Sequence, residues 1–202
     1  MSVPMAIVDF FPVALFLAGA LVLQRDLYHE MSKGAFALFS AGTITIFMAG
    51  LFKAGWKLLY ALSICDFEPL NKCFFPMQTT GFVLAGMGVL AMVVFPRQNA
   101  EACAAAAVPV LYTGTMLFVG LMILGVVALD GSLIVLAVRR KKLAAVPVFI
   151  LSFVFVLGMG YLSSKDFTIP AMNWLAEGVN TIGQGAFLVG AKMLADAKKQ
   201  TA

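Results

Sequence analysis

Apolar runs long enough to cross a lipid bilayer constrain this chain more than any other feature of its sequence. A helix rises about 1.5 Å per residue, so it needs about 20 apolar residues to span the hydrocarbon core. We therefore predict an all-α, polytopic integral membrane protein with about six transmembrane helices in a single transmembrane domain. The expected spans are residues 5–24, 34–57, 74–95, 107–129, 143–163 and 172–193.

The composition supports a lipid environment and argues against nucleic-acid binding. Hydrophobic residues make up 62% of the chain and charged residues only 12%, whereas about a quarter of an average soluble domain is charged. The net charge is +4, and the basic residues lie in short clusters between the apolar runs rather than along one face. We expect the lipid bilayer as a partner and no nucleic acid.

The sequence carries no motif for an enzyme with a soluble cofactor. It lacks GxxxxGK[ST], GxGxxG and HExxH, and the apolar runs leave no room for a soluble catalytic domain. His29 is the only histidine, and Cys65, Cys73 and Cys103 form no CxxC pair. We therefore expect no cofactor and no metal site. Cys65 and Cys73 are expected to be free thiols, with a disulfide between them as the alternative.

The fourth run leaves two structural alternatives open. Apolar sequence continues from Val108 to Val138 and is broken only by Asp130-Gly131-Ser132. This stretch is either one long helix with Asp130 near its end, or a helix followed by a short amphipathic piece. In the first run, Asp9 lies in the first turns, where an acidic side chain suits the helix dipole.

The distribution of lysine and arginine predicts the orientation of the chain. If the spans alternate, the loops on the N-terminal side are the more basic, and basic loops stay in the cytoplasm. We therefore predict a protein of the cell membrane with both termini in the cytoplasm. The basic residues expected on that side are Lys72, Arg139, Arg140, Lys141, Lys142, Lys192, Lys198 and Lys199, against Arg25, Lys33, Arg97 and Lys165 on the other.

Two segments about 100 residues apart resemble each other. Residues 60–67 (YALSICDF) are followed by Pro69 and Asn71, and residues 161–167 (YLSSKDF) by Pro170 and Asn173. Three spans reverse the direction of a chain, so the second copy is expected to be inverted. This predicts a 3+3 inverted repeat with halves 1–100 and 104–202, although chance similarity among apolar helices stays an alternative. Inverted repeats are frequent in transporters, with the binding site between the halves.

Polar residues gather on one face of the last predicted span. Glu177, Asn180, Thr181 and Gln184 fall within an arc of about 100°. A carboxylate inside a span is costly unless it is paired, hydrated or protonated. Glu177 is therefore either a proton or cation site with the amides as neutral ligands, or part of a hydrogen-bonded cluster between helices.

The second and third predicted spans carry further candidates. Lys53, Lys57 and Tyr60 share one helical face, as an anion-binding or headgroup-binding set or, the favoured interpretation, as lysines that snorkel to the interface. Gln78 lies on a face of small residues that predicts close helix packing. In an inverted repeat, Gln78 would approach Asn180 and Gln184 from the opposite leaflet.

These features predict a small membrane transporter or channel-like protein with a polar site between two halves. This reading expects Glu177, Gln184 and Lys57 around one hydrated cavity that binds a small solute or ion. One alternative is a non-catalytic membrane subunit or sensor that acts through a partner, as a homo-oligomer or with another membrane protein. A second alternative is an intramembrane enzyme acting on lipid. The ligand-binding or ion-binding candidates are Glu177, Asn180, Gln184, Gln78, Lys53, Lys57 and Tyr60.

Overall fold

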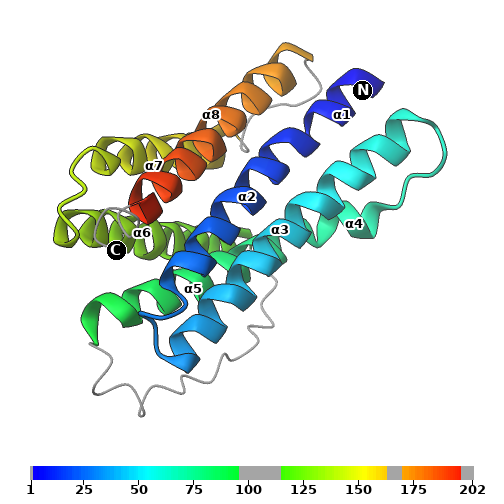
Figure 1. The fold of residues 1–202 in the computed structure, drawn as a ribbon. Coiled ribbons are helices and arrows are strands. Elements are labelled where there is room, and N and C mark those ends of the chain that lie inside the picture. The colour runs from blue at the N-terminus through cyan, green and yellow to red at the C-terminus, as the bar shows by residue number, and fades with distance from the viewer. Residues whose placement is uncertain (1, 96–114, 163–169, 197–202) are drawn as a thin grey trace.

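The computed structural model describes residues 2–95, 115–162 and 170–196, and every regular element in these residues is a helix (Figure 1). Five segments are long and apolar enough to cross a membrane: Val3–Leu27, Lys33–Ala61, Glu68–Val94, Phe118–Arg139 and Ala145–Leu162. This confirms the all-α class and is compatible with a helical membrane protein, although the last predicted span, residues 172–193, is not among the five. The helices are α1 (Val3–Val8), α2 (Phe10–Leu27), α3 (Lys33–Ala61), α4 (Glu68–Lys72), α5 (Phe74–Val94), α6 (Thr115–Arg139), α7 (Ala145–Leu162) and α8 (Pro170–Ala195).

Helix α6 runs without a break through Asp130-Gly131-Ser132, which settles the alternatives for the fourth apolar run. A glycine inside a helix costs about 1 kcal/mol relative to alanine. Leu129 and Leu133 on either side are fully buried in the core, and their burial outweighs that cost. The predicted start of this span, residues 107–114, lies outside the described residues.

A local interruption at Asp9 separates α1 from α2. Pro12 has no N–H to donate to the carbonyl of Val8, and its ring crowds that carbonyl. The two helices therefore form one span that is interrupted at Asp9, whose side chain is buried there.

Glycines allow the closest contacts between helices. Gly81 and Gly88 on α5 face α3, as the small-residue face of this span predicts. Gly125 on α6 packs on α5, where an added Cβ would lie 2.6 Å from the carbonyl carbon of Phe82 and 2.6 Å from the nitrogen of Val83. Backbones approach this closely only where no side chain intervenes.

Helices α5 and α6 run parallel to each other. Near their starts, Thr79 donates a hydrogen bond of 3.2 Å to the carbonyl of Phe118. At their ends, the Arg139 guanidinium donates a hydrogen bond of 2.7 Å to the carbonyl of Val93. Contacts that advance in the same direction along both helices define parallel packing.

Helices α2 and α8 are parallel as well. The rings of Phe16 and Phe187 stack with their centres 5.4 Å apart, and Gly19 packs on Phe187 one turn further along α2. At the far end, Arg140 hydrogen-bonds both Asp26 at the end of α2 and the carbonyl of Leu194 at the end of α8. The first and last long helices of the chain therefore share one direction.

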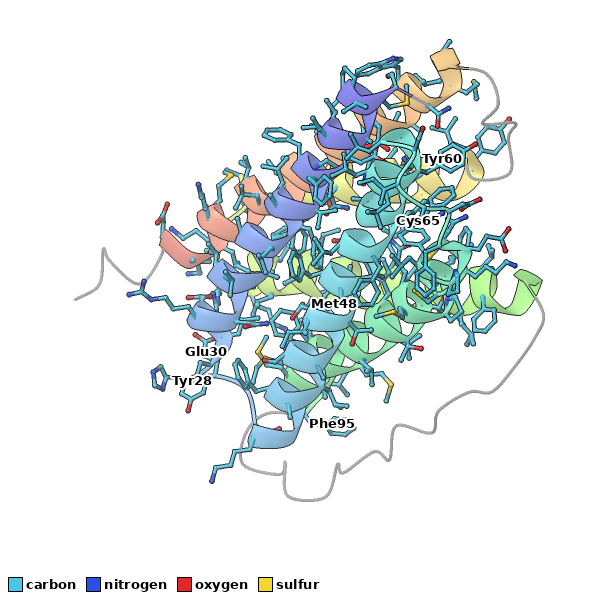
Figure 2. The ribbon with its side chains drawn as sticks, turned by 90° about the vertical axis from the view of Figure 1, so that its right-hand side faces the viewer. Tyr28, Glu30, Met48, Tyr60, Cys65 and Phe95 are labelled. Carbon is cyan, nitrogen blue, oxygen red and sulfur yellow. The ribbon has the colours of Figure 1, made fainter. Side chains whose placement is uncertain are left out.

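The described helices form two three-helix units that point the same way. The first unit contains α1/α2, α3 and α5, and the second contains α6, α7 and α8; α3 and α7 are the descending helix of each. The expected inverted arrangement is therefore wrong for the described helices. It assumed that successive spans alternate in direction, whereas Phe95 and Thr115 lie at opposite ends of the bundle. Figure 2 shows Phe95 at the same end as Tyr28 and Glu30, with Tyr60 and Cys65 toward the other end.

The parallel units also separate the two ends of the described helices. Val3 at the start of α1 and Ala195 at the end of α8 lie at opposite ends of the bundle (Figure 1). We call the end with Val3 the N-terminal end. The other end, the basic end, holds Arg25, Lys33, Arg139, Arg140, Lys141, Lys142 and Lys192.

Site-directed labelling distinguishes the parallel from the inverted arrangement. In a background with all three cysteines replaced by serine, we expect Ser2→Cys and Lys141→Cys to react with a membrane-impermeant maleimide from opposite sides of the membrane. Lys33→Cys should react from the same side as Lys141→Cys. Alternating spans predict the reverse for both pairs, so that pattern of labelling would contradict the parallel packing of α5 and α6.

The glycine contact between the two units gives a stability prediction. Gly125→Val is expected to lower the free energy of unfolding by about 1–3 kcal/mol, because the added side chain has no room beside Phe82. Gly120→Val on the same helix is the matched control, since a Cβ there meets nothing within 4 Å. Denaturant titration in mixed micelles measures both, and equal losses in the two variants would refute tight packing at Gly125.

Candidate functional site

Three charged side chains from distant parts of the chain meet inside the bundle near its N-terminal end. Lys57 on α3 forms an ion pair with Asp9 between α1 and α2, and its Nζ donates a hydrogen bond of 3.2 Å to Glu177 Oε1 on α8. Asp9, Lys57 and Glu177 are only 5%, 9% and 8% exposed. We call these three residues the ion cluster. It joins the first unit to the second.

The ion cluster holds two carboxylates against one ammonium group. Asp9 Oδ1 and Glu177 Oε2 are buried and have no hydrogen-bond partner among the described residues. Buried polar atoms without partners are costly, and more so when they carry charge. A proton on either carboxyl would cancel the excess negative charge and would provide a donor between the two groups. The chemistry available to the cluster is therefore proton or cation binding.

A polar cavity of about 220 Å³ lies between the two units. Lys53 of α3 enters it, with its Nζ 4.0 Å from the centre of the Phe74 ring. Three amides, Gln78 of α5 and Asn180 and Gln184 of α8, contribute the other polar groups. The cavity is lined by Lys53, Phe74, Phe75, Gln78, Phe82, Met122, Val156, Met159, Gly160, Asn180 and Gln184.

Helical spacing places the ion cluster next to this cavity. Lys57 follows Lys53 by four residues on α3, and Glu177 precedes Asn180 by three on α8. Residues at these spacings are neighbours on one face of a helix. The helices α3 and α8 run in opposite directions. Lys57 therefore lies one turn nearer the N-terminal end than Lys53, and Glu177 lies one turn nearer that end than Asn180. The cluster therefore lies beside the cavity, on the side toward that end.

The structure brings together six of the seven residues singled out in the sequence. Lys53, Gln78, Asn180 and Gln184 line the cavity, and Lys57 and Glu177 pair beside it. Tyr60 lies elsewhere, because it is 47% exposed and stacks on Trp56 with ring centres 5.8 Å apart.

Two further expectations are corrected. The snorkelling interpretation is wrong for Lys57, whose ammonium group pairs with carboxylates inside the protein instead of reaching the interface. Gln78 and Gln184 do share one cavity, but they reach it from helices that run in the same direction rather than from opposite leaflets.

The sequence reading missed Asp9. It was assigned to the helix dipole, although an acidic residue in an apolar run has the same need for a partner as Glu177. Lys57, Asp9 and Glu177 are each ionisable residues inside predicted spans, and such residues usually pair with one another. That pattern could have pointed to Asp9, but not to which carboxylate pairs with which lysine.

A second group of charged side chains connects helices at the basic end. Arg140 forms ion pairs with Asp26 in the last turn of α2 and with Glu30 in the connection from α2 to α3. Burial lowers the pKa of the Arg140 guanidinium, but its hydrogen bonds to Asp26 and Glu30 outweigh burial and raise that pKa above its ordinary value. Arg140 therefore stays charged and holds the end of α6 to the end of α2.

Metal chemistry finds no support in the described residues, where no three His, Cys, Asp or Glu side chains are arranged to hold an ion. Cys65 and Cys73 are free thiols. The comparisons with known proteins give no further assignment: no protein-family model, no curated protein and no solved structure matches the chain.

Removal of the central ammonium group tests the ion cluster. We expect Lys57→Met to lower the free energy of unfolding at pH 7 by about 3–5 kcal/mol, because two buried carboxylates lose their counter-charge. The matched control is Lys72→Met, which breaks the fully exposed pair with Glu68 and should leave the stability close to that of the wild type.

Denaturant titration in mixed micelles measures both variants. Adding Asp9→Asn and Glu177→Gln to Lys57→Met should recover most of the lost stability, because no unpaired buried charge then remains. A triple variant as unstable as Lys57→Met would show that the loss comes from packing rather than from charge.

Proposed function

We propose that this chain is a small membrane transporter or channel-like protein whose solute site is the cavity between its two three-helix units. The observation that carries the proposal is the lining of that cavity. Its polar groups come from α3 and α5 of the first unit and from α8 of the second, while α6 and α7 complete the wall. Polar side chains are expensive inside a membrane and mark solute or ion pathways when they face an internal cavity.

The arrangement of the units gives independent support. Transporters built from two structural repeats bind their solutes between the repeats, and parallel repeats related by an axis along the membrane normal are one of the known arrangements. The resemblance between residues 60–67 and 161–167 connects the end of α3 with the end of α7, which are equivalent helices in the two units. We therefore propose a duplicated unit in parallel rather than inverted orientation.

The distribution of charge supports an orientation in the membrane. The basic end carries the Arg139–Lys142 run, whereas Lys72 is the one exposed lysine of the described residues at the N-terminal end. Because basic segments remain in the cytoplasm, we propose that the basic end is cytoplasmic and that the ion cluster lies toward the opposite side.

The alternative functions fit the site less well. A non-catalytic subunit predicts polar groups that satisfy one another and leave no cavity, whereas Lys53 and three amides surround open space. A lipid-modifying enzyme requires a nucleophile beside a general base, and the described residues that line the cavity include no serine, cysteine, histidine or carboxylate.

Solute flux into proteoliposomes tests the proposed function. We would measure uptake of glycerol, urea, glycine and propionate, and proton entry with an internal pH dye, and we expect at least one rate well above that of protein-free vesicles. Gly160→Phe should lower that rate at least about fivefold, because Gly160 lines the cavity and a Cβ there meets nothing within 4 Å, so the ring can fill the space.

The matched control is Gly120→Phe, which adds the same ring on an exposed face of α6 with equal room. It should leave the rate within about twofold of wild type, since it lies outside the cavity. Rates no higher than those of empty vesicles for every solute and for protons would overturn the proposed function.

A further inference from the structure

We infer that the solute is a small carboxylate with a short apolar tail, bound at Lys53, and that it binds together with one proton held by Asp9 and Glu177. This inference rests on the proposed function and deepens it, because it names the class of solute and the ion that accompanies it. It is carried by the charges around the cavity and by the contacts of the ion cluster.

The positive charge in the cavity belongs to Lys53. Among the described residues, the carboxylates near Lys53 are Asp9 and Glu177, and both pair with Lys57 instead. Lys53 lies against the faces of Phe74 and Phe75, which are neutral. The cavity therefore contains one ammonium group without a carboxylate partner, and a single negative charge is its natural complement.

The rest of the cavity wall is formed by amides and apolar side chains. The amides Gln78, Asn180 and Gln184 each carry two N–H donors, and a carboxylate has lone pairs for several of them besides the ammonium group. Phe82, Met122, Val156 and Met159 form an apolar wall that suits a short hydrocarbon tail. A doubly charged anion fits less well, because Lys53 is the one cation among the described residues of the lining.

The charged side chains of the cavity and the ion cluster balance one another. On α1/α2 the charged group is Asp9, on α3 it is Lys53 and Lys57, and on α8 it is Glu177; the cavity residues from α5, α6 and α7 are uncharged. Within the described part of the chain, these two positive and two negative charges leave the site neutral when it is empty. A bound carboxylate would make it negative inside an apolar surrounding, and one proton taken from solvent restores neutrality.

The two carboxylates of the ion cluster can hold that proton. Asp9 Oδ1 and Glu177 Oε2 are the buried oxygens of the ion cluster that lack partners, and both belong to carboxylates already drawn together by Lys57. A proton on one oxygen converts an acceptor into a donor for the other carboxylate. Since binding free energies are reciprocal, a proton that strengthens carboxylate binding is itself held more tightly when the carboxylate is bound.

Calorimetry on the purified full-length chain in detergent tests this inference without requiring transport. The probes are propionate and its neutral isostere propionamide, titrated between pH 5 and 8 in phosphate and in Tris, whose ionisation enthalpies differ. We expect propionate to bind at least about tenfold more tightly than propionamide, because only propionate complements Lys53. The difference in heat between the buffers should correspond to uptake of close to one proton per propionate.

Three variants assign the roles. Lys53→Met should weaken propionate binding at least about tenfold and leave propionamide binding unchanged. Glu177→Gln should still bind propionate but take up no proton, so its affinity becomes independent of pH; if it does not fold, Asp9→Asn takes its place. Asp130→Asn is the matched control, because it neutralises another buried carboxyl, on α6 and away from the cavity lining, and it should retain proton uptake.

The outcomes separate this inference from the proposed function. Propionate binding without proton uptake in wild type, or uptake that survives Glu177→Gln and Asp9→Asn, overturns the inference. A neutral solute that crosses the proteoliposomes while propionate does not bind overturns it too and leaves the proposed function standing. Propionate binding with proton uptake, but with no flux of any solute or of protons, supports the site and overturns transport.

Discussion

The ion pairs of Lys57 with Asp9 and Glu177 are the interaction on which the arrangement of this protein depends. They connect the first helix, the second long helix and the last, which are remote in sequence. Charged groups inside an apolar bundle are stable only when they are paired, so each of the three positions constrains the others. Asp9 lies at the interruption between α1 and α2, which follows from the missing N–H and the ring of Pro12.

Two parallel helix contacts complete the scaffold around this cluster. α2 packs on α8 and α5 packs on α6, so that each unit contributes one helix to each contact. Glycines bring the backbones together in both places, Gly19 in the first and Gly125 in the second. The cavity lies between the units, where α3, α5 and α8 contribute a lysine and three amides.

Much of the candidate site could be read from helical periodicity. Residues three, four or seven positions apart share one face of a straight helix. This spacing groups Lys53 with Lys57 on one helix. It also groups Glu177, Asn180 and Gln184 on another. Periodicity says nothing about which helix lies opposite, so it left open whether Lys57 snorkels or pairs and where Gln78 is directed. Asp9 was missed for the same reason, since its role depends on a partner 48 residues away.

The sequence by itself determined the element type and, except for the fourth predicted span, the approximate limits of the long helices. These follow from local composition, because any apolar stretch of this length must satisfy its backbone internally and so forms a helix in lipid. The direction of the second unit, the separation of Val3 from Ala195 and the pairing of Lys57 were decided only by the tertiary structure. They depend on contacts between helices distant in sequence, such as Gly86 on Gly125 and Arg140 on Asp26, which no local pattern encodes.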